Sequence, residues 1–105
     1  MSAHADRPIR YRVIYSERVR AELKELLSRS VFRGMGSHAL EAVKTIDSRL
    51  HIYPQFGQPL RDLKTEGSTL WIAVVWPLVV QYVLDEERRL VFVLAPFQML
   101  PHTAG

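Results

Sequence analysis

The 105-residue chain contains no cysteine, and this absence excludes disulfide bonds, thiol catalysis and thiolate metal sites together. It also lacks a run of about 20 apolar residues, the length that a transmembrane helix needs. Residues 1–12 are polar and charged, without the apolar stretch of a secretory signal. We therefore expect a cytoplasmic protein that does not associate with a membrane.

The chain also lacks the signatures of metal and nucleotide sites. Gly34 and Gly36 are not followed by the Gly-Lys-Ser/Thr sequence of a phosphate-binding loop. No carboxylate pair completes a zinc-type site, and no two of the four histidines have ligand spacing on one helix face: His4, His38, His51 and His102. We expect no metal and no other cofactor.

What is present fits a single domain over residues 1–105, with an ordered core at about 9–97 and polar tails at both ends. Apolar residues make up 48% of the chain, which is ordinary for a globular protein. The net charge is +3, and its basic excess lies in residues 1–29, where seven Lys/Arg face four Asp/Glu. Such an excess is compatible with a polyanionic partner but does not require one.

The first half of the chain predicts a strand followed by two helices. Residues 11–15 alternate and are β-branched, which indicates a short strand. Ser16 and Ser37 are placed to cap two helices, and Pro54 ends the second. The apolar positions recur at helical spacing and should pack on the sheet: Val19, Leu23, Leu26, Leu40, Val43, Ile46 and Leu50.

The second half predicts a loop and three strands. Residues 54–63 contain two prolines and a glycine and indicate an ordered loop. The apolar runs at 69–76, 78–85 and 90–97 are separated by short connections, which favours an antiparallel meander. The expected fold is therefore an α+β domain of order β-α-α-β-β-β, with a helical hairpin packed on a small antiparallel sheet.

Four aromatic residues lie in or beside these strands: Trp71, Trp76, Phe92 and Phe97. They have the chemistry of stacking platforms for nucleic-acid bases. Their position amid valines and leucines is more typical of a core or an interface. With only two covering helices, part of this apolar surface should remain open for a homodimer or a partner protein.

Three motifs in order resemble the RelE/ParE toxin superfamily, which comprises toxins of type II toxin–antitoxin systems and plasmid stabilisation proteins. They are Tyr-Ser-Glu at 15–17, Ile-Tyr-Pro-Gln-Phe-Gly-Gln-Pro-Leu-Arg-Asp-Leu at 52–63, and Tyr-Val-Leu-Asp with its following hydrophobic strand at 82–94. The resemblance covers residues 9–97. It implies the same α+β fold and a cognate antitoxin that wraps the toxin.

The chain departs from the nucleases of this family at one central position. They commonly carry an arginine three residues before the tyrosine that matches Tyr82, and here Val79 stands there. RNA cleavage needs a base, a cation on the phosphate and an acid for the leaving oxygen. Valine supplies none of these, so an enzymatic role is undecided. Any enzyme activity would be that of an mRNA endoribonuclease.

The resemblance makes Arg61 the first candidate for a contact with phosphate or target. A loop ion pair with Asp62 or Glu66 is the structural alternative. Lys64 and Arg89 are further candidates for binding, although both residue types are usually solvated in loops and turns. The weak catalytic candidates are Arg61, Lys64 and His102.

Three functions remain open. The first is a ParE-like toxin, neutralised by an antitoxin, that binds a target such as DNA gyrase. The second is a RelE-like toxin that cuts mRNA on the ribosome. The third is a family member without catalysis that serves as an interaction module. The valine at position 79 favours a binding mode over cleavage.

Overall fold

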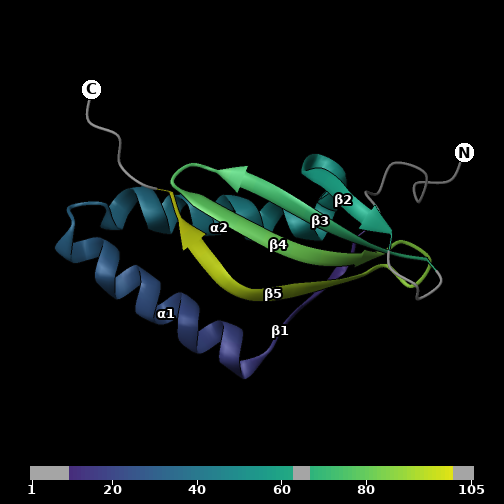
Figure 1. Ribbon diagram of the computed structural model, residues 1–105, viewed down its shortest axis with the longest axis horizontal. Helices are drawn as coiled ribbons and strands as arrows, with labels where there is room; N and C mark the ends of the chain where they lie inside the picture. Colours follow the sequence, from purple (N-terminus) through teal and green to yellow (C-terminus); the bar gives the residue numbers. More distant parts are fainter. Residues whose placement is uncertain (1–9, 63–66, 101–105) are drawn as a thin grey trace, which may run out of the picture.

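The computed structural model describes residues 10–62 and 67–100, where two helices pack on one face of a five-stranded sheet (Figure 1). The strand order is β1-β5-β4-β3-β2. The predicted α+β class and the helical hairpin are confirmed. The elements are β1 (Arg12–Tyr15), α1 (Glu17–Phe32), α2 (Gly36–Ile52), η2 (Pro54–Phe56), β2 (Gln58–Asp62), β3 (Ser68–Val75), β4 (Leu78–Asp85) and β5 (Leu90–Met99).

The sheet differs from the expected one in two strands. The β3–β4–β5 meander is antiparallel as predicted, but β1 pairs with β5 in parallel. A parallel pair needs a long crossover, and the chain supplies one through both helices and three strands. The segment predicted as a loop also contains β2, which pairs with β3 and carries a bulge between Pro59 and Arg61. A proline is tolerated there because β2 is an edge strand.

The helical hairpin begins with the predicted cap, since the side chain of Ser16 accepts a hydrogen bond from the amide of Val19 at 3.1 Å. The predicted cap at Ser37 is wrong, because α2 already starts at Gly36. The turn between the helices is tight: Gly34 has a φ of 71°. A Cβ on Gly36 would lie 2.9 Å from a methyl carbon of Val31, so the close approach needs glycine.

The core lies between the helices and the inner face of the sheet. From the helices it takes Val19, Leu26, Ala42, Ile46 and Leu50, and from the sheet Ala73, Leu78, Val80, Tyr82, Leu84, Val91, Val93 and Phe97. Leu23 and Val43 pack against this core as predicted. Leu40 does not, because it is 44% exposed while Ala39 and Ala42 are buried. Small residues therefore form the contact face of α2 where a leucine was expected.

A hydrogen bond from Tyr15 connects β1 to α2. The Tyr15 hydroxyl donates to Oδ1 of Asp47 at 2.6 Å, and the amide of Tyr11 donates to the carbonyl oxygen of His51 at 2.7 Å. Burial, reinforced by the bond to Asp47, raises the pKa of Tyr15 above its usual value. The hydroxyl thus stays protonated as a donor at neutral pH.

Replacing Tyr15 by phenylalanine should lower the free energy of unfolding by about 1 kcal/mol, the usual worth of one hydrogen bond. Urea denaturation at pH 7 measures this change. Tyr53→Phe is the matched control, because Tyr53 is exposed and should tolerate the loss of its hydroxyl. Equal stabilities of the two variants would contradict the role of Tyr15.

Gly57 lies where η2 passes into β2. A methyl group there would lie 2.5 Å from the carbonyl oxygen of Ile72 and 2.6 Å from the hydroxyl oxygen of Tyr82. Both neighbours belong to the sheet, and the Tyr82 hydroxyl is held by a hydrogen bond to the carbonyl oxygen of Pro54 at 2.6 Å. The site therefore has no room for a side chain.

We expect Gly57→Ala to lower the free energy of unfolding by about 1–3 kcal/mol, the range found for overpacked sites. The neighbouring Gln58→Ala, at an exposed residue, should change it by less than about 0.5 kcal/mol. Thermal and urea unfolding of both variants test the difference. A Gly57→Ala protein as stable as the unaltered chain would refute the close packing.

Candidate functional site

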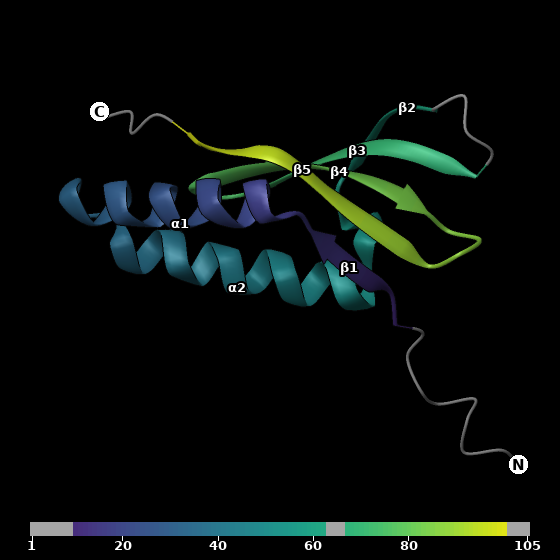
Figure 2. The same cartoon turned by 90° about the horizontal axis from the view of Figure 1, so that it is seen from below.

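The sheet has one covered and one open face. Figure 2 shows α1 and α2 on the same side of the sheet. Side chains alternate along a strand, so the buried Leu78, Val80, Tyr82 and Leu84 of β4 face the helices. Their neighbours face the other way. We call this opposite side the outer face; its residues are Arg12 and Ile14 of β1, Gln58 and Arg61 of β2, Ser68, Leu70, Ile72 and Val74 of β3, Val79, Gln81, Val83 and Asp85 of β4, and Leu90, Phe92, Leu94 and Gln98 of β5.

Strand register aligns these residues in rows across the sheet. One row crosses all five strands and runs Ile14, Phe92, Val83, Leu70, Arg61. It is apolar up to β2, where it ends in a cation. The next row contains Leu94, Gln81, Ile72 and Gln58. The outer face is therefore an apolar band with amides beside it, Arg61 at the β2 edge and the exposed Arg12 at the β1 edge.

The outer face is accessible as well as apolar. Val74 is 59% exposed, Phe92 38% and Ile14 36%. The remaining apolar residues of this face are half-buried. A contiguous apolar surface of this kind is a candidate interaction site.

The structure separates the predicted binding residues. Arg61 lies on β2 and is exposed. Arg61 forms no ion pair with any side chain that the structure describes. The side chains of Asp62 and Glu66, its expected partners, lie outside the described set. Arg89 precedes β5, and its carbonyl oxygen accepts from the amide of Arg12 on β1. Since β3 and β4 lie between β5 and β2, Arg61 and Arg89 do not form one site.

The remaining sequence candidates are Lys64 and His102, and Arg88 is the neighbour of Arg89. Lys64 and His102 lie outside the described residues. Arg88 forms an ion pair with the buried carboxylate of Asp85, Nη1 to Oδ2 at 3.1 Å, and its amide donates to the same carboxylate. This arrangement closes the β4–β5 turn and is structural.

On the outer side of the central strand the one titratable group is Asp85 at its end, and that carboxylate is buried and ion-paired with Arg88. Val79, Gln81 and Val83 face outward there and none of them titrates. The tyrosines whose pKa changes, Tyr15 and Tyr82, lie on the helix side; burial raises the pKa of Tyr82 to about 12. Within residues 10–62 and 67–100, no cluster of three potential metal ligands occurs. The described part of this face can bind a partner but offers no acid–base pair.

Most of the aromatic residues are not stacking platforms. Trp71 and Phe97 belong to the helix side, and Trp76 packs edge-on against His38 with ring centroids 5.4 Å apart. Only Phe92 among the four predicted aromatics lies on the outer face. The interpretation as core is thus confirmed for Trp71 and Phe97.

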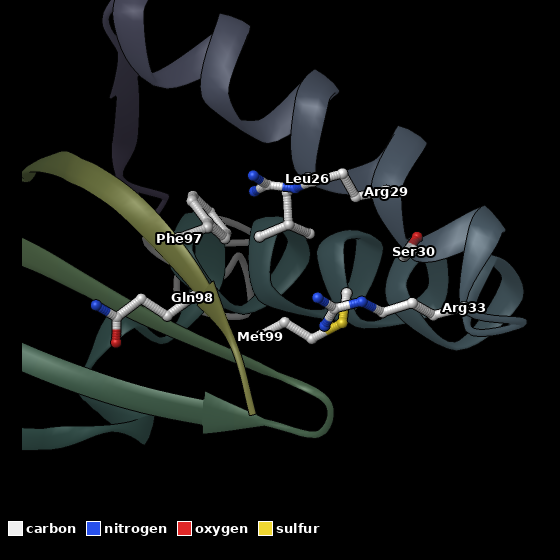
Figure 3. Close-up of a pocket in the computed structure, with 7 residues that line it drawn as sticks. All are labelled: Leu26, Arg29, Ser30, Arg33, Phe97, Gln98 and Met99. Carbon is white, nitrogen blue, oxygen red and sulfur yellow. The ribbon is translucent and has the colours of Figure 1, made fainter. Parts of the chain in front are cut away.

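A second feature was not anticipated from the sequence. A groove of about 490 Å³ lies between the C-terminal half of α1 and the end of β5 (Figure 3). We call it the α1–β5 groove; its lining is Leu26, Arg29, Ser30, Arg33, Phe97, Gln98 and Met99. The only sequence signal was Arg29 and Arg33, four residues apart on one helix face. Nothing in the sequence places that face beside β5.

No helix in the described residues has both the length and the apolar character needed to cross a membrane. No protein-family model and no curated protein sequence matches the chain.

Proposed function

We propose that this protein is the toxin-like component of a type II toxin–antitoxin module, neutralised by an antitoxin and acting by binding its target. The resemblance of residues 15–17, 52–63 and 82–94 to RelE/ParE toxins supports the family. The β-α-α-β-β-β order, to which the structure adds β2, is compatible with it. Within the family, the proposal favours the ParE-like mode, in which a target such as DNA gyrase is bound and inhibited, over RNA cleavage.

The observation that carries the choice of mode is the outer side of β4. A ribonuclease needs a cation at the phosphate and groups that accept and donate protons. The central strand offers Val79, Gln81 and Val83 instead, and the carboxylate of Asp85 at its end is buried and ion-paired with Arg88. Arg61 stands two strands away on β2, where a single cation can bind phosphate or a carboxylate but cannot move a proton.

An apolar outer face suits a protein target. Phe92 and Ile14 lie in one row with Val83 and Leu70, and large apolar residues at the centre of an interface contribute most of its binding energy. Arg61 at the edge of this row is placed as a rim contact. Such charges affect association rate and orientation more than affinity.

The choice of mode predicts the result of a nuclease assay. Ribosome-programmed mRNA should remain uncut by the unaltered protein under conditions where an active RelE-type nuclease cuts completely. Val79→Arg should not create cleavage, because an acid and a base would still be missing. Losing one stabilising donor already costs about 10²–10³ in rate.

Cleavage in the ribosomal A site by the unaltered protein, abolished by Arg61→Ala, would overturn the ParE-like mode. It would make Arg61 a catalytic residue and promote the RelE-like alternative.

The toxicity itself is tested by induced expression in bacteria, with DNA supercoiling by gyrase measured on the purified protein. We expect growth arrest and gyrase inhibition, both reduced at least about tenfold by Phe92→Asp, since a charge in an apolar contact is costly to bury. Leu40→Asp is the matched control, because Leu40 is similarly exposed but lies on α2.

Growth arrest without gyrase inhibition would support the toxin proposal but show that the target is not DNA gyrase. No arrest at all, from a folded protein, would contradict the toxin proposal and favour an interaction module. Equal effects of the two aspartate variants would show that the outer face is not the contact surface.

A further inference from the structure

The α1–β5 groove lies apart from the apolar band of the outer face. Its lining comes from the C-terminal half of α1 and from the last residues of β5 (Figure 3). Of the lining residues only Gln98 belongs to the outer face, since Phe97 and Met99 pack on the helix side. The groove has a volume of about 490 Å³, within the range of about 300–1,000 Å³ found for small-molecule sites. It can therefore hold a small molecule without involving the apolar band.

The floor of the groove is apolar. Leu26 and Phe97 are only 3% and 5% exposed, and Met99 packs against the same core. These side chains offer a ligand apolar contact but no strong hydrogen-bonding group. Phe97 is too deeply buried to present an open ring face, on which a nucleobase would stack. The floor therefore suits a flexible aliphatic chain better than a flat aromatic ring.

Two cations extend from the helix side of the groove. In Figure 3 the side chains of Arg29 and Arg33 reach from α1 toward β5, with Leu26 between them. Arg33 forms no ion pair with a described residue. Nη1 of Arg29 lies 3.9 Å from Oε1 of Glu25, and both of these side chains are more than half exposed, so the pair contributes little. Two guanidinium groups are thus available to a ligand.

The polar groups of the groove are suited to an anion with two negative charges. Both arginines only donate hydrogen bonds, and none of the lining residues is acidic. The hydroxyl of the buried Ser30 already donates to the carbonyl oxygen of Leu27 at 2.6 Å. A phosphate monoester carries about −1.5 to −2 charges at neutral pH and presents three oxygens as acceptors. It can therefore neutralise both guanidinium groups, whereas a carboxylate is already satisfied by one of them.

We propose that the α1–β5 groove binds a soluble alkyl phosphate, with the phosphate on Arg29 and Arg33 and the aliphatic chain along Leu26, Phe97 and Met99. The planar donor fork of arginine matches the oxygens of a phosphate, and burial of the chain removes apolar surface from water. The inference goes beyond the proposed function, because it requires neither toxicity nor a protein partner.

The probe is n-octyl phosphate, titrated into the ¹⁵N-labelled full chain below the concentration at which the ester forms micelles. We expect saturable changes in the amide signals of residues 26–33 and 97–99. Affinity should fall at least about tenfold for 1-octanol, which lacks the charged head, and for inorganic phosphate, which lacks the chain. Adenosine 5′-monophosphate should also bind at least about tenfold more weakly, because its flat base finds no open ring to stack on.

Vesicles that contain phosphatidic acid distinguish a membrane lipid from a soluble ester. The phosphate of such a lipid stays at the bilayer surface while its chains remain inside, so they cannot reach the floor of the groove. We expect the protein to remain in solution when the vesicles are sedimented.

The length of the alkyl chain tests the apolar floor in the unaltered protein. From ethyl to butyl to hexyl phosphate, affinity should rise by up to about fourfold for each added methylene group, the effect of burying one CH₂. An affinity that does not change with chain length would contradict the role of the floor.

Variants locate the charge contact. The negative end of the α1 dipole lies near the groove and disfavours an anion, so the two guanidinium groups must supply the attraction. Arg29→Gln with Arg33→Gln should weaken binding of octyl phosphate at least about tenfold, because both charge-assisted contacts are lost. The matched control is Arg20→Gln with Lys24→Gln, which removes two exposed charges four residues apart on the same helix. It should change affinity by less than about twofold, since exposed charges outside the site are screened. Circular dichroism confirms that each variant is folded.

Several results would overturn the inference. Equal affinity for 1-octanol would show an apolar surface without a phosphate site, and equal affinity for inorganic phosphate would show an anion site without a place for the chain. Signal changes centred on Phe92 and Val83 would place the alkyl chain on the outer face instead. Equal losses in both double variants, or retention of the protein on the vesicles, would also contradict the site.

The binding assay and the toxicity assay fail separately. An absence of growth arrest together with intact binding of octyl phosphate would contradict only the proposed function. Growth arrest by a protein that does not bind octyl phosphate would contradict only the groove as a ligand site.

Discussion

The hydroxyl of Tyr82 donates a hydrogen bond of 2.6 Å to the carbonyl oxygen of Pro54, and the arrangement of the site depends on this contact. Tyr82 is fully buried at the centre of β4. Its ring stacks with those of Phe56 and Trp71, with centroids 6.3 and 6.4 Å away. The segment after α2 is thereby held against the sheet, so that β2 can pair with β3 and place Arg61 on the outer face.

Much of the fold follows from local patterns. Ser16 was recognisable as a cap because its short polar side chain precedes a helical repeat. The β3–β4–β5 meander was recognisable because apolar runs alternate with short turns. β2 was missed because Gly57 and Pro59 indicate a loop, and only pairing with β3 makes the segment a strand. Leu40 was misplaced because helical spacing alone cannot tell that Ala39 and Ala42 allow the closer contact.

The site was predictable only in part. Arg61 was found through a motif, and the structure places it at the end of the row formed by Ile14, Phe92, Val83 and Leu70. Arg89 and Arg61 could not be separated from the sequence, because strand order decides their distance. The α1–β5 groove forms only when the chain folds, because Leu26 and Met99 are far apart in the sequence. Neither residue on its own predicts a groove. Periodicity identifies the buried face of an element but not which element it meets.

The parallel pairing of β1 with β5 also has a consequence for synthesis of the chain. Arg12 pairs with Leu90 and Tyr15 with Val93, so β1 finds its partner only when β5 has emerged from the ribosome. Contacts between such distant residues slow folding, since loop closure must precede them. Until then the helical hairpin exists without the sheet that covers its apolar side. A nascent chain of this protein should therefore lack both the completed outer face and the edge of β5 until residues 90–99 have emerged.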